Sequence, residues 1–356
     1  MHFILLQSPR VPVMENWVPV KVLGQGSYAV VCLAKQSSAI RKKSDNNLPY
    51  YFAVKLSPLQ HNSSLLWEEQ VLKQFKDCPE IVQYLGSEIT RGRDIRNDHV
   101  DFYTLKLEYA AGGTLDDLIE QRDKLPEAEV KDYLRMILKG LSCIHSKGFV
   151  HVDLKPNNIL AFPQSDGKMK LKIADFGQAE RSKYRVDDQH KQYPPCCSSF
   201  KFKGTPRYMS PESVVFNEVN DADDIWSLGC ILVKMISGKS AWDDCKDSKQ
   251  LMIKLLDNKI MPTIPGELSE QGKDFIKKCF IRNYKERWTA EMLLQHPYLN
   301  EENEAPMNNK NEATMKKDNE ATMQKDDEAT VDASCCFNKL ILKFSIAKLF
   351  LTCFNL

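Results

Sequence analysis

The main change in the spacing of apolar residues comes near residue 110 of this 356-residue chain, and that change limits the folds that the chain can adopt. Up to about residue 108, short runs of alternating apolar and polar residues are separated by Gly-rich and polar loops, which predicts strands. The interval 64–75 has helical spacing instead. Beyond residue 112 the spacing is helical, most clearly over 126–147 and 223–237. We therefore expect an α+β protein with two lobes, a small β-rich N-lobe containing one helix and a larger α-helical C-lobe.

The predicted folded domain covers residues 17–299 and follows an N-terminal extension over residues 1–16. Its N-lobe is expected over 17–108 and its C-lobe over 112–299, with the link between them near Glu108–Gly113. The strands expected in the N-lobe are Val18–Leu23, Val30–Lys35, Tyr51–Leu56, Ile81–Gly86 and Asp101–Glu108.

The chain after residue 299 has a different character. Glu304–Met307 begins a series of similar units that recur every eight residues up to Val331, surrounded by Lys, Asp and Asn. Units so short and polar cannot bury a core, which predicts a disordered linker over 300–333. Residues 334–356 are apolar, but their Lys residues interrupt the run well short of the ~20 residues that a membrane-spanning helix needs. We expect no transmembrane span, and either contact with a membrane surface or a partner, or folding back onto the domain.

Charge and cysteine content exclude several classes of protein. Lys and Arg total 49 and Asp and Glu total 48, so a net charge of +1 gives no reason to expect a nucleic-acid partner. The eleven cysteines include no pair of C-x-x-C elements for a zinc site. The apolar patch Phe3–Leu6 has no basic residue before it, so it is not a secretory signal. We expect a cytoplasmic or nuclear protein with reduced thiols, in which disulfides are not needed.

A Gly-rich turn, Gly24-Gln25-Gly26, lies between the first two predicted strands. Such a turn lets backbone amides approach phosphate groups, although Gly pairs are also common in ordinary hairpins.

Lys55 ends an otherwise apolar strand segment, so it needs either an anionic partner or a solvent-facing position. Glu68 lies one helical turn before Leu72, and an inward Leu72 would turn Glu68 toward the sheet. We therefore expect Glu68 to be the partner of Lys55, with Glu69 as the alternative.

Two loops in the second half of the chain carry the strongest chemical pattern. In the first, Asp153 is followed by Lys155 and Asn158, and in the second, Asp175-Phe176-Gly177 follows a short predicted strand. An Asp close to a hydroxyl can accept its proton, and a Lys can balance the charge of a migrating phosphoryl group. Oxygen atoms of Asn and Asp are ligands that Mg²⁺ prefers. Each residue alone could be a polar turn residue, but that reading does not explain the ordered set.

With these motifs in this order, residues 17–299 resemble eukaryotic protein kinases. Ser210-Pro211-Glu212 resembles the Ala-Pro-Glu element of that family, and Arg287 resembles the Arg that pairs with its Glu. The segment from Asp224 to Gly229 resembles the buried helix that anchors the catalytic loop.

Two further features narrow the resemblance. Lys155 and Gly204-Thr205-Pro206 resemble the corresponding residues of serine/threonine kinases. The segments 107–115 and 204–213, together with a non-Arg residue before Asp153, are similar to plant-type MAP kinase kinase kinases. The substrates implied are proteins, with MAP kinase kinases among them.

The resemblance implies a role for each residue of the pattern. Asp153 would be the catalytic base and Lys155 would balance charge, while Lys55, held by Glu68, would grip the phosphates of ATP. Asn158 and Asp175 would bind Mg²⁺. The other residues expected to contact ATP are Gly24, Gln25, Gly26, Val31, Ala53, Glu108, Ala110 and Leu160. The residues expected to form an apolar stack on Asp224 are Leu72, Tyr84, His151 and Phe176.

The sequence departs from the commonest kinase pattern at Val152, where an Arg would offer a bidentate partner for a phosphate. The residues that remain for phosphorylation in the following loop are Ser182, Tyr184, Ser198 and Ser199, and the nearby cations are Lys201 and Lys203. Two alternatives stay open, a serine/threonine kinase outside a MAP kinase cascade and a catalytically silent scaffold. The presence of every chemistry-bearing residue favours the enzyme.

Overall fold

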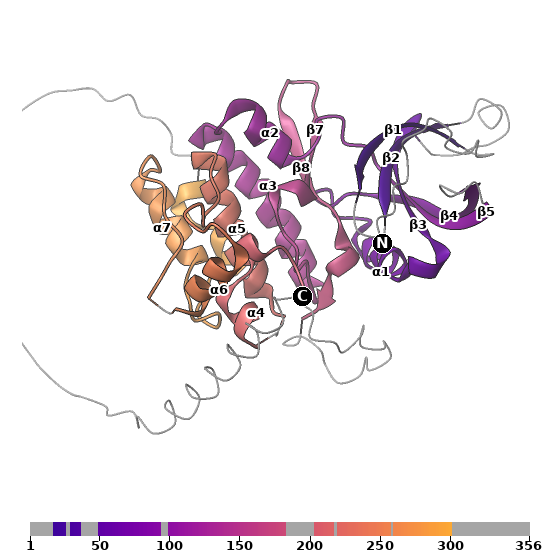
Figure 1. Cartoon of the computed structure of the whole chain (residues 1–356). Coiled ribbons are helices and arrows are strands. Elements are labelled where there is room, and N and C mark those ends of the chain that lie inside the picture. Colours follow the sequence, from indigo (N-terminus) through magenta and orange to yellow (C-terminus); the bar gives the residue numbers. More distant parts are fainter. Residues whose placement is uncertain are drawn as a thin grey trace, which may run out of the picture. The chain divides into compact units, whose positions relative to one another are not determined.

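Alternating apolar residues form the strands of the N-lobe, as the sequence predicts. The computed structural model describes residues 17–25, 29–36, 49–93, 99–182, 203–216, 219–257 and 259–300. The predicted N-terminal extension, nearly all of the linker and the segment 334–356 lie outside the described residues. The described residues belong to one unit, and they form a β-rich lobe followed by a helical lobe (Figure 1). This arrangement confirms the predicted two-lobed α+β class.

The N-lobe sheet is antiparallel, with the strand order β1-β2-β3-β5-β4. Its strands are β1 (Trp17–Gln25), β2 (Val30–Gln36), β3 (Tyr51–Pro58), β4 (Tyr84–Arg93) and β5 (His99–Leu107). Phe52 and Val54 pack with Trp17 and Ala34 in a small separate cluster. Since side chains alternate across a strand, Ala53 and Lys55 point to the opposite face, where Ala53 joins the main core.

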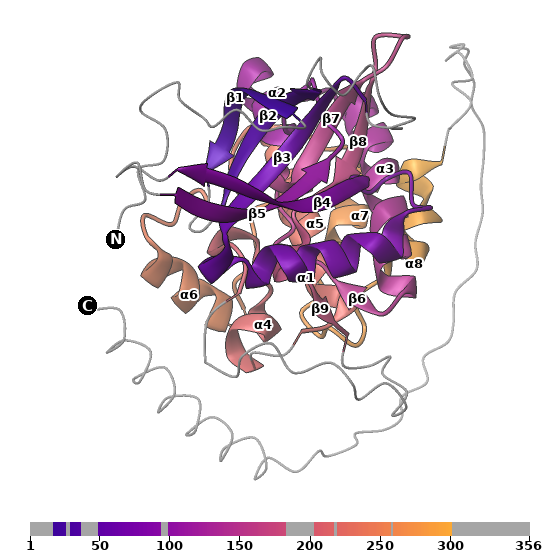
Figure 2. The same cartoon turned by 90° about the vertical axis from the view of Figure 1, so that its right-hand side faces the viewer.

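Helix α1 (Ser63–Leu72) lies alongside this sheet, between short 3-10 turns over Leu59–His61 and Lys73–Phe75 (Figure 2). Leu65, Val71 and Leu72 are buried in the main core. The helix therefore presents its apolar side to the core and brings its two adjacent glutamates, Glu68 and Glu69, to buried positions.

The prediction of a strand over Ile81–Gly86 was wrong at both ends. The strand begins at Tyr84 and continues to Arg93, and Ile81 forms only a bridge with Ile173 of the C-lobe. The Val82 N–H donates to the Ile173 carbonyl at 2.9 Å. The apolar start of this segment therefore joins the two lobes instead of extending the sheet.

The C-lobe is built around buried helices. Its longer helices are α2 (Leu115–Arg122), α3 (Glu127–Ser146), α5 (Asp221–Ser237), α6 (Ser248–Leu256) and α7 (Glu270–Cys279), and its shorter ones are α4 (Pro211–Phe216) and α8 (Ala290–Leu294). Two small antiparallel sheets, β6 (Phe149–Val150) with β9 (Glu180–Arg181) and β7 (Ile159–Pro163) with β8 (Met169–Ile173), flank the loops that connect these strands. The 3-10 turns are Pro156–Asn158, Phe176–Gln178, Pro206–Tyr208 and Pro297–Leu299.

Helix α5 has clear local signals at both ends. Asn220 and Asp223 form a capping box at its start. The Asn220 side chain accepts from the backbone N–H groups of Ala222 and Asp223, and the Asp223 side chain accepts from the Asn220 N–H. Gly238 ends it with φ 72°, and a Cβ there would lie 2.1 Å from the Asp123 carbonyl oxygen. The helix therefore stops where only glycine fits.

One expectation about the cysteines was wrong. Cys78, in the loop before β4, and Cys143, on α3, are joined in a disulfide with their Cα atoms 6.7 Å apart. These positions are 65 residues apart in the sequence. They meet only because α3 packs against the N-lobe, so no spacing rule indicated the pair. The remaining cysteines among the described residues are unpaired and buried: Cys32, Cys230, Cys245 and Cys279.

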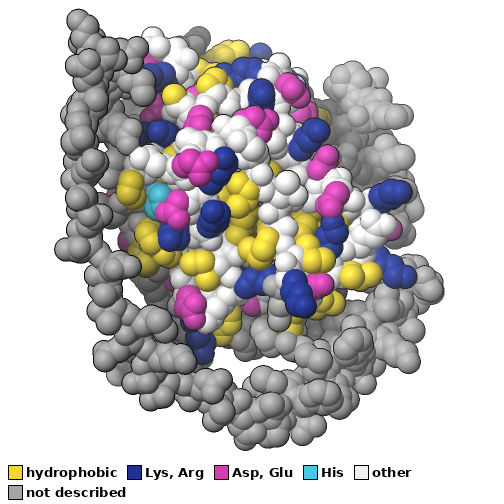
Figure 3. Space-filling model, turned by 90° about the vertical axis from the view of Figure 1, so that its left-hand side faces the viewer, with side chains coloured by type: hydrophobic (Ala, Val, Ile, Leu, Met, Phe, Trp, Pro, Cys, Tyr) yellow, Lys and Arg dark blue, Asp and Glu magenta, His cyan; other side chains and the backbone are white. Residues whose placement is uncertain are grey.

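The end of the C-lobe farthest from the N-lobe carries a mixed surface. Figure 3 shows Lys and Arg side chains interspersed with Asp and Glu around a group of apolar side chains. Among the described residues, no helix is both long and apolar enough to cross a bilayer.

Candidate active site

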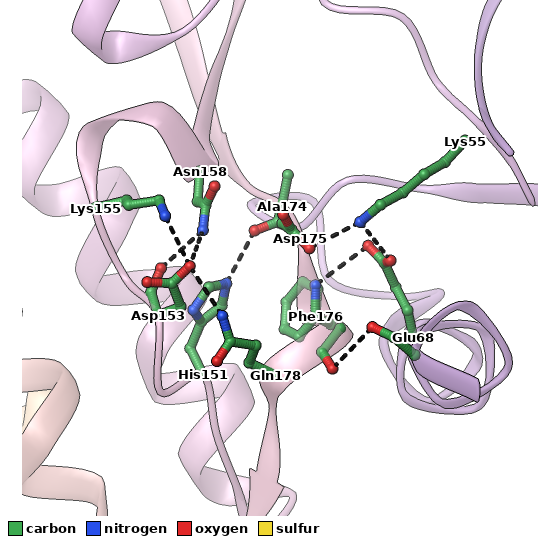
Figure 4. Close-up of polar contacts among 12 residues, drawn as sticks. Lys55, Glu68, His151, Asp153, Lys155, Asn158, Ala174, Asp175, Phe176 and Gln178 are labelled. Carbon is green, nitrogen blue, oxygen red and sulfur yellow. Dashed lines mark hydrogen bonds and ion pairs between the residues drawn. The ribbon is translucent and has the colours of Figure 1, made fainter. Parts of the chain in front are cut away.

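Lys55 lies between two carboxylates from different parts of the chain (Figure 4). Its Nζ is 2.7 Å from Glu68 Oε2 on α1 and 2.8 Å from Asp175 Oδ1, which follows β8. Glu68 is fully buried, whereas the Asp175 side chain is 47% exposed. The contact therefore links the sheet, the helix and the second loop at one cation.

The surroundings set the charges of these three groups. Burial alone would lower the pKa of Lys55, but the Glu68 and Asp175 carboxylates raise it above its usual range. Burial raises the pKa of Glu68, against the effect of Lys55 and of the Phe176 N–H, which donates to Glu68 Oε1 at 3.3 Å. Burial would also raise the pKa of Asp175, but the Lys55 ammonium lowers it. The cation and the exposed carboxylate thus stay charged at the edge of the site.

Glu69, the alternative partner for Lys55, points into a different network. Its carboxylate accepts hydrogen bonds from Tyr84 and Ser87, each at 2.8 Å, and from the Tyr103 hydroxyl, and it pairs with Lys73. Burial alone would raise the pKa of Glu69, but these donors lower it to about 2. Glu69 therefore ties α1 to β4 and β5.

The loop after β6 gathers its polar side chains around Asp153. Asp153 Oδ2 lies 2.8 Å from Lys155 Nζ, and Oδ1 accepts from the Thr205 hydroxyl at 2.7 Å. Lys155 Nζ also donates to Thr205 Oγ1 at 2.8 Å. Thr205, although 52 residues away in the sequence, thereby becomes part of the site.

The backbone of this loop is hydrogen-bonded to the Asp224 side chain of α5. Its Oδ2 accepts from the His151 N–H at 2.8 Å, and its Oδ1 accepts from the Val152 N–H at 3.1 Å. Val152 has φ 72°, a conformation that β-branched residues rarely adopt. The buried carboxylate therefore supports a strained turn directly before Asp153.

Asn158 and Asp175 present oxygen atoms suited to Mg²⁺. The Asn158 amide nitrogen donates to the Asp153 carbonyl at 2.8 Å, and its amide oxygen points away from Asp153 (Figure 4). The half-exposed Asp175 carboxylate supplies the second oxygen donor. The described residues contain no group of three or more His, Cys, Asp or Glu that could enclose a metal. Two protein oxygens fit an ion that takes its other ligands from phosphate and water.

The residues expected to contact a nucleotide come from both lobes. Gly24 pairs with Val31 across the first hairpin, and Val31 pairs with Lys55 across the second. Ala53 is buried in register with Leu107, the last residue of β5. Leu160 lies on β7, where it bridges to Thr114. Gln25 is the last residue of β1, and Gly26 lies outside the described residues.

The link between the lobes contains an ion pair that sequence reasoning missed. Both Glu108 carboxylate oxygens accept from Lys172 Nζ of β8, at 2.6 and 2.7 Å, and Oε1 also accepts from the Gln83 N–H at 2.8 Å. The Glu108 side chain thus ties the link to the C-lobe. Ala110 follows in the link, and its carbonyl accepts from the Gly113 N–H at 3.4 Å. Nothing in the sequence indicated that Lys172 would pair with Glu108, because Lys172 is one of several similar Lys residues in this segment.

The apolar residues expected to stack in the centre are buried or half-buried there. Leu72 and Phe176 belong to the main core, and Tyr84 packs against it. His151 is fully buried, with its ring centroid 5.0 Å from that of Phe176 and its Nε2 2.9 Å from the Ala174 carbonyl. The contact between the His151 and Phe176 rings thus anchors the residue that follows Asp175 in the core.

Arg287 and Glu212 form a buried pair below the site. Arg287 Nη2 lies 3.1 Å from Glu212 Oε2, Nη1 also contacts this carboxylate, and Nε donates to the Ile281 carbonyl at 2.9 Å. The pair fixes α4 to the helical lobe, close to the segment that carries Thr205.

The residues available for phosphorylation between Asp175 and Glu212 fall largely outside the described residues. Tyr184, Ser198 and Ser199 lie there, as does Lys201. Ser182 is described and buried. Lys203 is also described, and it forms an ion pair with Glu180.

Comparison with known proteins gives a consistent result. The family model described as "Protein kinase domain" matches residues 17–299. "Mitogen-activated protein kinase kinase kinase 20" of Arabidopsis thaliana is 38% identical over 293 residues, which cover 81% of this chain and 80% of that protein. "Mitogen-activated protein kinase kinase kinase 18" of the same plant is 35% identical, with 81% and 79% covered. The yeast (Saccharomyces cerevisiae) "Serine/threonine-protein kinase BCK1/SLK1/SSP31" is 34% identical, with 81% of this chain but 18% of that protein covered.

Proposed function

Because the chain belongs to the protein kinase family, we propose that it transfers the γ-phosphoryl group of ATP to serine or threonine hydroxyls of MAP kinase kinases, as a MAP kinase kinase kinase. The observation that carries this proposal is the assembled site, in which Asp153 contacts Lys155 and the Thr205 hydroxyl while Lys55 is paired with Glu68. A catalytically silent scaffold would not need these groups in contact.

Asp153 is proposed to accept the proton of the substrate hydroxyl. The Thr205 hydroxyl, 2.7 Å from Asp153 Oδ1, shows that a hydroxyl can approach this carboxylate. The substrate oxygen forms a bond to the γ-phosphorus, and the bond from that phosphorus to the bridging oxygen of ADP breaks. Lys155 balances the negative charge that moves during the transfer.

Lys55 is proposed to orient the α- and β-phosphates, because Glu68 and Asp175 hold its ammonium at the edge of the site. Asn158 and Asp175 would hold Mg²⁺, which when bound neutralises charge on the phosphates. Backbone groups of Glu108 and Ala110 would bind adenine. The residues proposed to complete the nucleotide site are Gly24, Gln25, Gly26, Val31, Ala53 and Leu160.

The substrate class can be tested with purified full-length chain. We expect incorporation of phosphate into MAP kinase kinases to exceed incorporation into myelin basic protein and casein, and to vanish when the acceptor Ser and Thr of the MAP kinase kinase are changed to Ala. Asp153→Asn is the matched inactive control, because it keeps the side-chain volume and removes the base.

The possible outcomes separate the candidate functions. Equal phosphorylation of all substrates would favour a serine/threonine kinase outside a MAP kinase cascade. Binding of Mg-ATP without phosphorylation of any substrate would favour the silent scaffold.

We also propose a cytoplasmic or nuclear location and a surface contact for residues 334–356, on sequence grounds alone. Fluorescence imaging of the full chain and of a chain lacking residues 301–356 would test both, and a shift of only the full chain to membranes would support the surface contact.

A further inference from the structure

The residues just after Asp175-Phe176-Gly177 contact the residues around Thr205. The side chains that make these contacts belong to none of the sequence motifs described above. Gln178 Oε1 accepts from the Gly204 N–H at 3.1 Å, and Gln178 Nε2 reaches Asp153 Oδ2 at 3.5 Å. One side-chain amide thus bridges the carboxylate of the proposed base and the backbone next to Thr205 (Figure 4 shows its approach to Asp153).

A second contact lies beside the first. Glu180 and Lys203 form an ion pair in which the two side chains are 30% and 33% exposed. Glu180 lies on β9, paired with Val150 of β6, so its carboxylate belongs to the framework of the catalytic loop. Gln178–Glu180 and Lys203–Thr205 are thereby joined at two points.

The backbone also approaches closely here. Gly204 has φ 94°, and a Cβ on it would lie 2.8 Å from the Val152 carbonyl oxygen. Only glycine allows the segment to lie this near the loop that carries Asp153. Small shifts at Gly204 would therefore move the neighbouring Thr205 hydroxyl away from Asp153.

The signs of the charges matter for regulation. Two cations lie near this contact: Lys203, which pairs with Glu180, and Lys155 of the catalytic loop, which contacts both Asp153 and the Thr205 hydroxyl. Both cations therefore already contact carboxylates, and a phosphate added near Thr205 would have to compete with Asp153 or Glu180 for them.

We propose that Gln178, Glu180, Lys203 and Gly204 form a latch that positions Thr205 against Asp153 without phosphorylation. Gln178 and Lys203 are positioning residues, since they act on the reacting groups through Gly204 and Thr205. The inference deepens the proposed function, on which its catalytic consequence rests. The contact itself can be measured independently of activity.

The test uses phosphatase-treated full-length chain and follows both kinase activity and hydrogen exchange of the peptide that contains Gly204. Glu180→Gln and Lys203→Gln each remove one charge of the pair, and the double exchange Glu180→Lys with Lys203→Glu restores opposite charges. Gln178→Met removes both amide contacts at similar volume. Lys254→Gln is the matched control, since it breaks a pair with Asp244 elsewhere in the C-lobe.

We expect each variant of the latch to lower kcat roughly fivefold and to speed exchange at Gly204 by about the same factor, as loss of one partly exposed ion pair or hydrogen bond predicts. The KM for ATP should change by less than about twofold, because the nucleotide groups are untouched. The double variant with swapped charges should restore both kcat and the hydrogen-exchange rate at Gly204, and Lys254→Gln should change neither.

Three results would overturn the latch. The first is a wild-type rate of hydrogen exchange at Gly204 in all single variants. The second is a double variant with swapped charges that behaves no better than the single variants. The third is a phosphatase-treated wild-type chain whose hydrogen exchange at Gly204 is as fast as that of Lys203→Gln. Faster exchange in the variants of a chain that phosphorylates nothing would support the latch and refute the proposed function. A chain that phosphorylates MAP kinase kinases, but whose hydrogen exchange at Gly204 is the same in all variants, would support the proposed function and refute the latch.

Discussion

Replacing Lys55 by Met tests the proposed site most directly, because it removes one charge and keeps the length of the side chain. The lost ammonium lies 2.7 Å from Glu68 and 2.8 Å from Asp175. We expect the rate of phosphoryl transfer to fall by at least ~10²-fold, since one preorganised cation at developing phosphate charge contributes about that much.

The same change should also lower stability, because it leaves the Glu68 carboxylate buried without a cation. Removing one partner of a buried ion pair costs about 3–5 kcal/mol. The Lys55 side chain is 13% exposed, so water reaches the site and we expect the lower end of that range. Burial raises the pKa of Glu68 above its unfolded value. Relative to the wild-type chain, the loss of stability should therefore be smallest below the ordinary glutamate pKa, and it should grow as pH rises through the raised pKa of Glu68.

A second variant separates stability from catalysis. Lys55→Met combined with Glu68→Gln removes the unpaired charge, so urea unfolding at neutral pH should show recovered stability while phosphoryl transfer stays low. Near wild-type turnover in Lys55→Met would refute the role of the cation. A double variant no more stable than the single one would refute the reasoning about the buried carboxylate.

Two other perturbations follow from the structure, and a third follows from the sequence of the tail. Lys172→Met removes two bonds to Glu108 and should raise the KM for ATP roughly fivefold in steady-state kinetics with little change in kcat, whereas an unchanged KM would count against a role for this pair. The pKa of Glu69 is lowered to about 2, so its stabilising effect is present above the ordinary glutamate pKa and is lost as pH falls below it. In Glu69→Gln, the unfolding free energy should therefore fall less on acidification than in the wild-type chain, by on the order of 3 kcal/mol. An unchanged dependence of the unfolding free energy on acid pH would contradict this. Deletion of residues 301–356 should leave kinase activity intact and abolish sedimentation with anionic liposomes; a collapse of activity would show that the tail belongs to the fold.

Much of the fold was predictable because its signals are local. The apolar stripe of α3 is a repeat within one helix, and its residues Val130, Leu134, Ile137 and Leu141 are all buried in the structure. The capping residues of α5 lie within one turn of its start. Strand alternation likewise predicted β2, β3 and β5. Where a strand-like run served another purpose, as at Ile81, the local pattern failed because its partner Ile173 lies in the other lobe.

The order of the loop motifs indicated which residues would supply the chemistry, since residue type and short spacing determine what a loop can bind or deprotonate. Asp153, Lys155, Asn158 and Asp175 could all be named without coordinates. Their mutual distances could not.

Only the tertiary structure decided which side chains meet across long separations. The spacing to Leu72 favoured Glu68 over Glu69 as the partner of Lys55, and the packing of α1 decided between them. The same packing directs Glu69 to Tyr84 and Tyr103, which no local spacing indicated. Gln178 gave no signal in the sequence, because an amide becomes a bridge only when Asp153 and Gly204 lie on either side of it. Such contacts depend on how whole elements pack, and periodicity within one element carries no information about that.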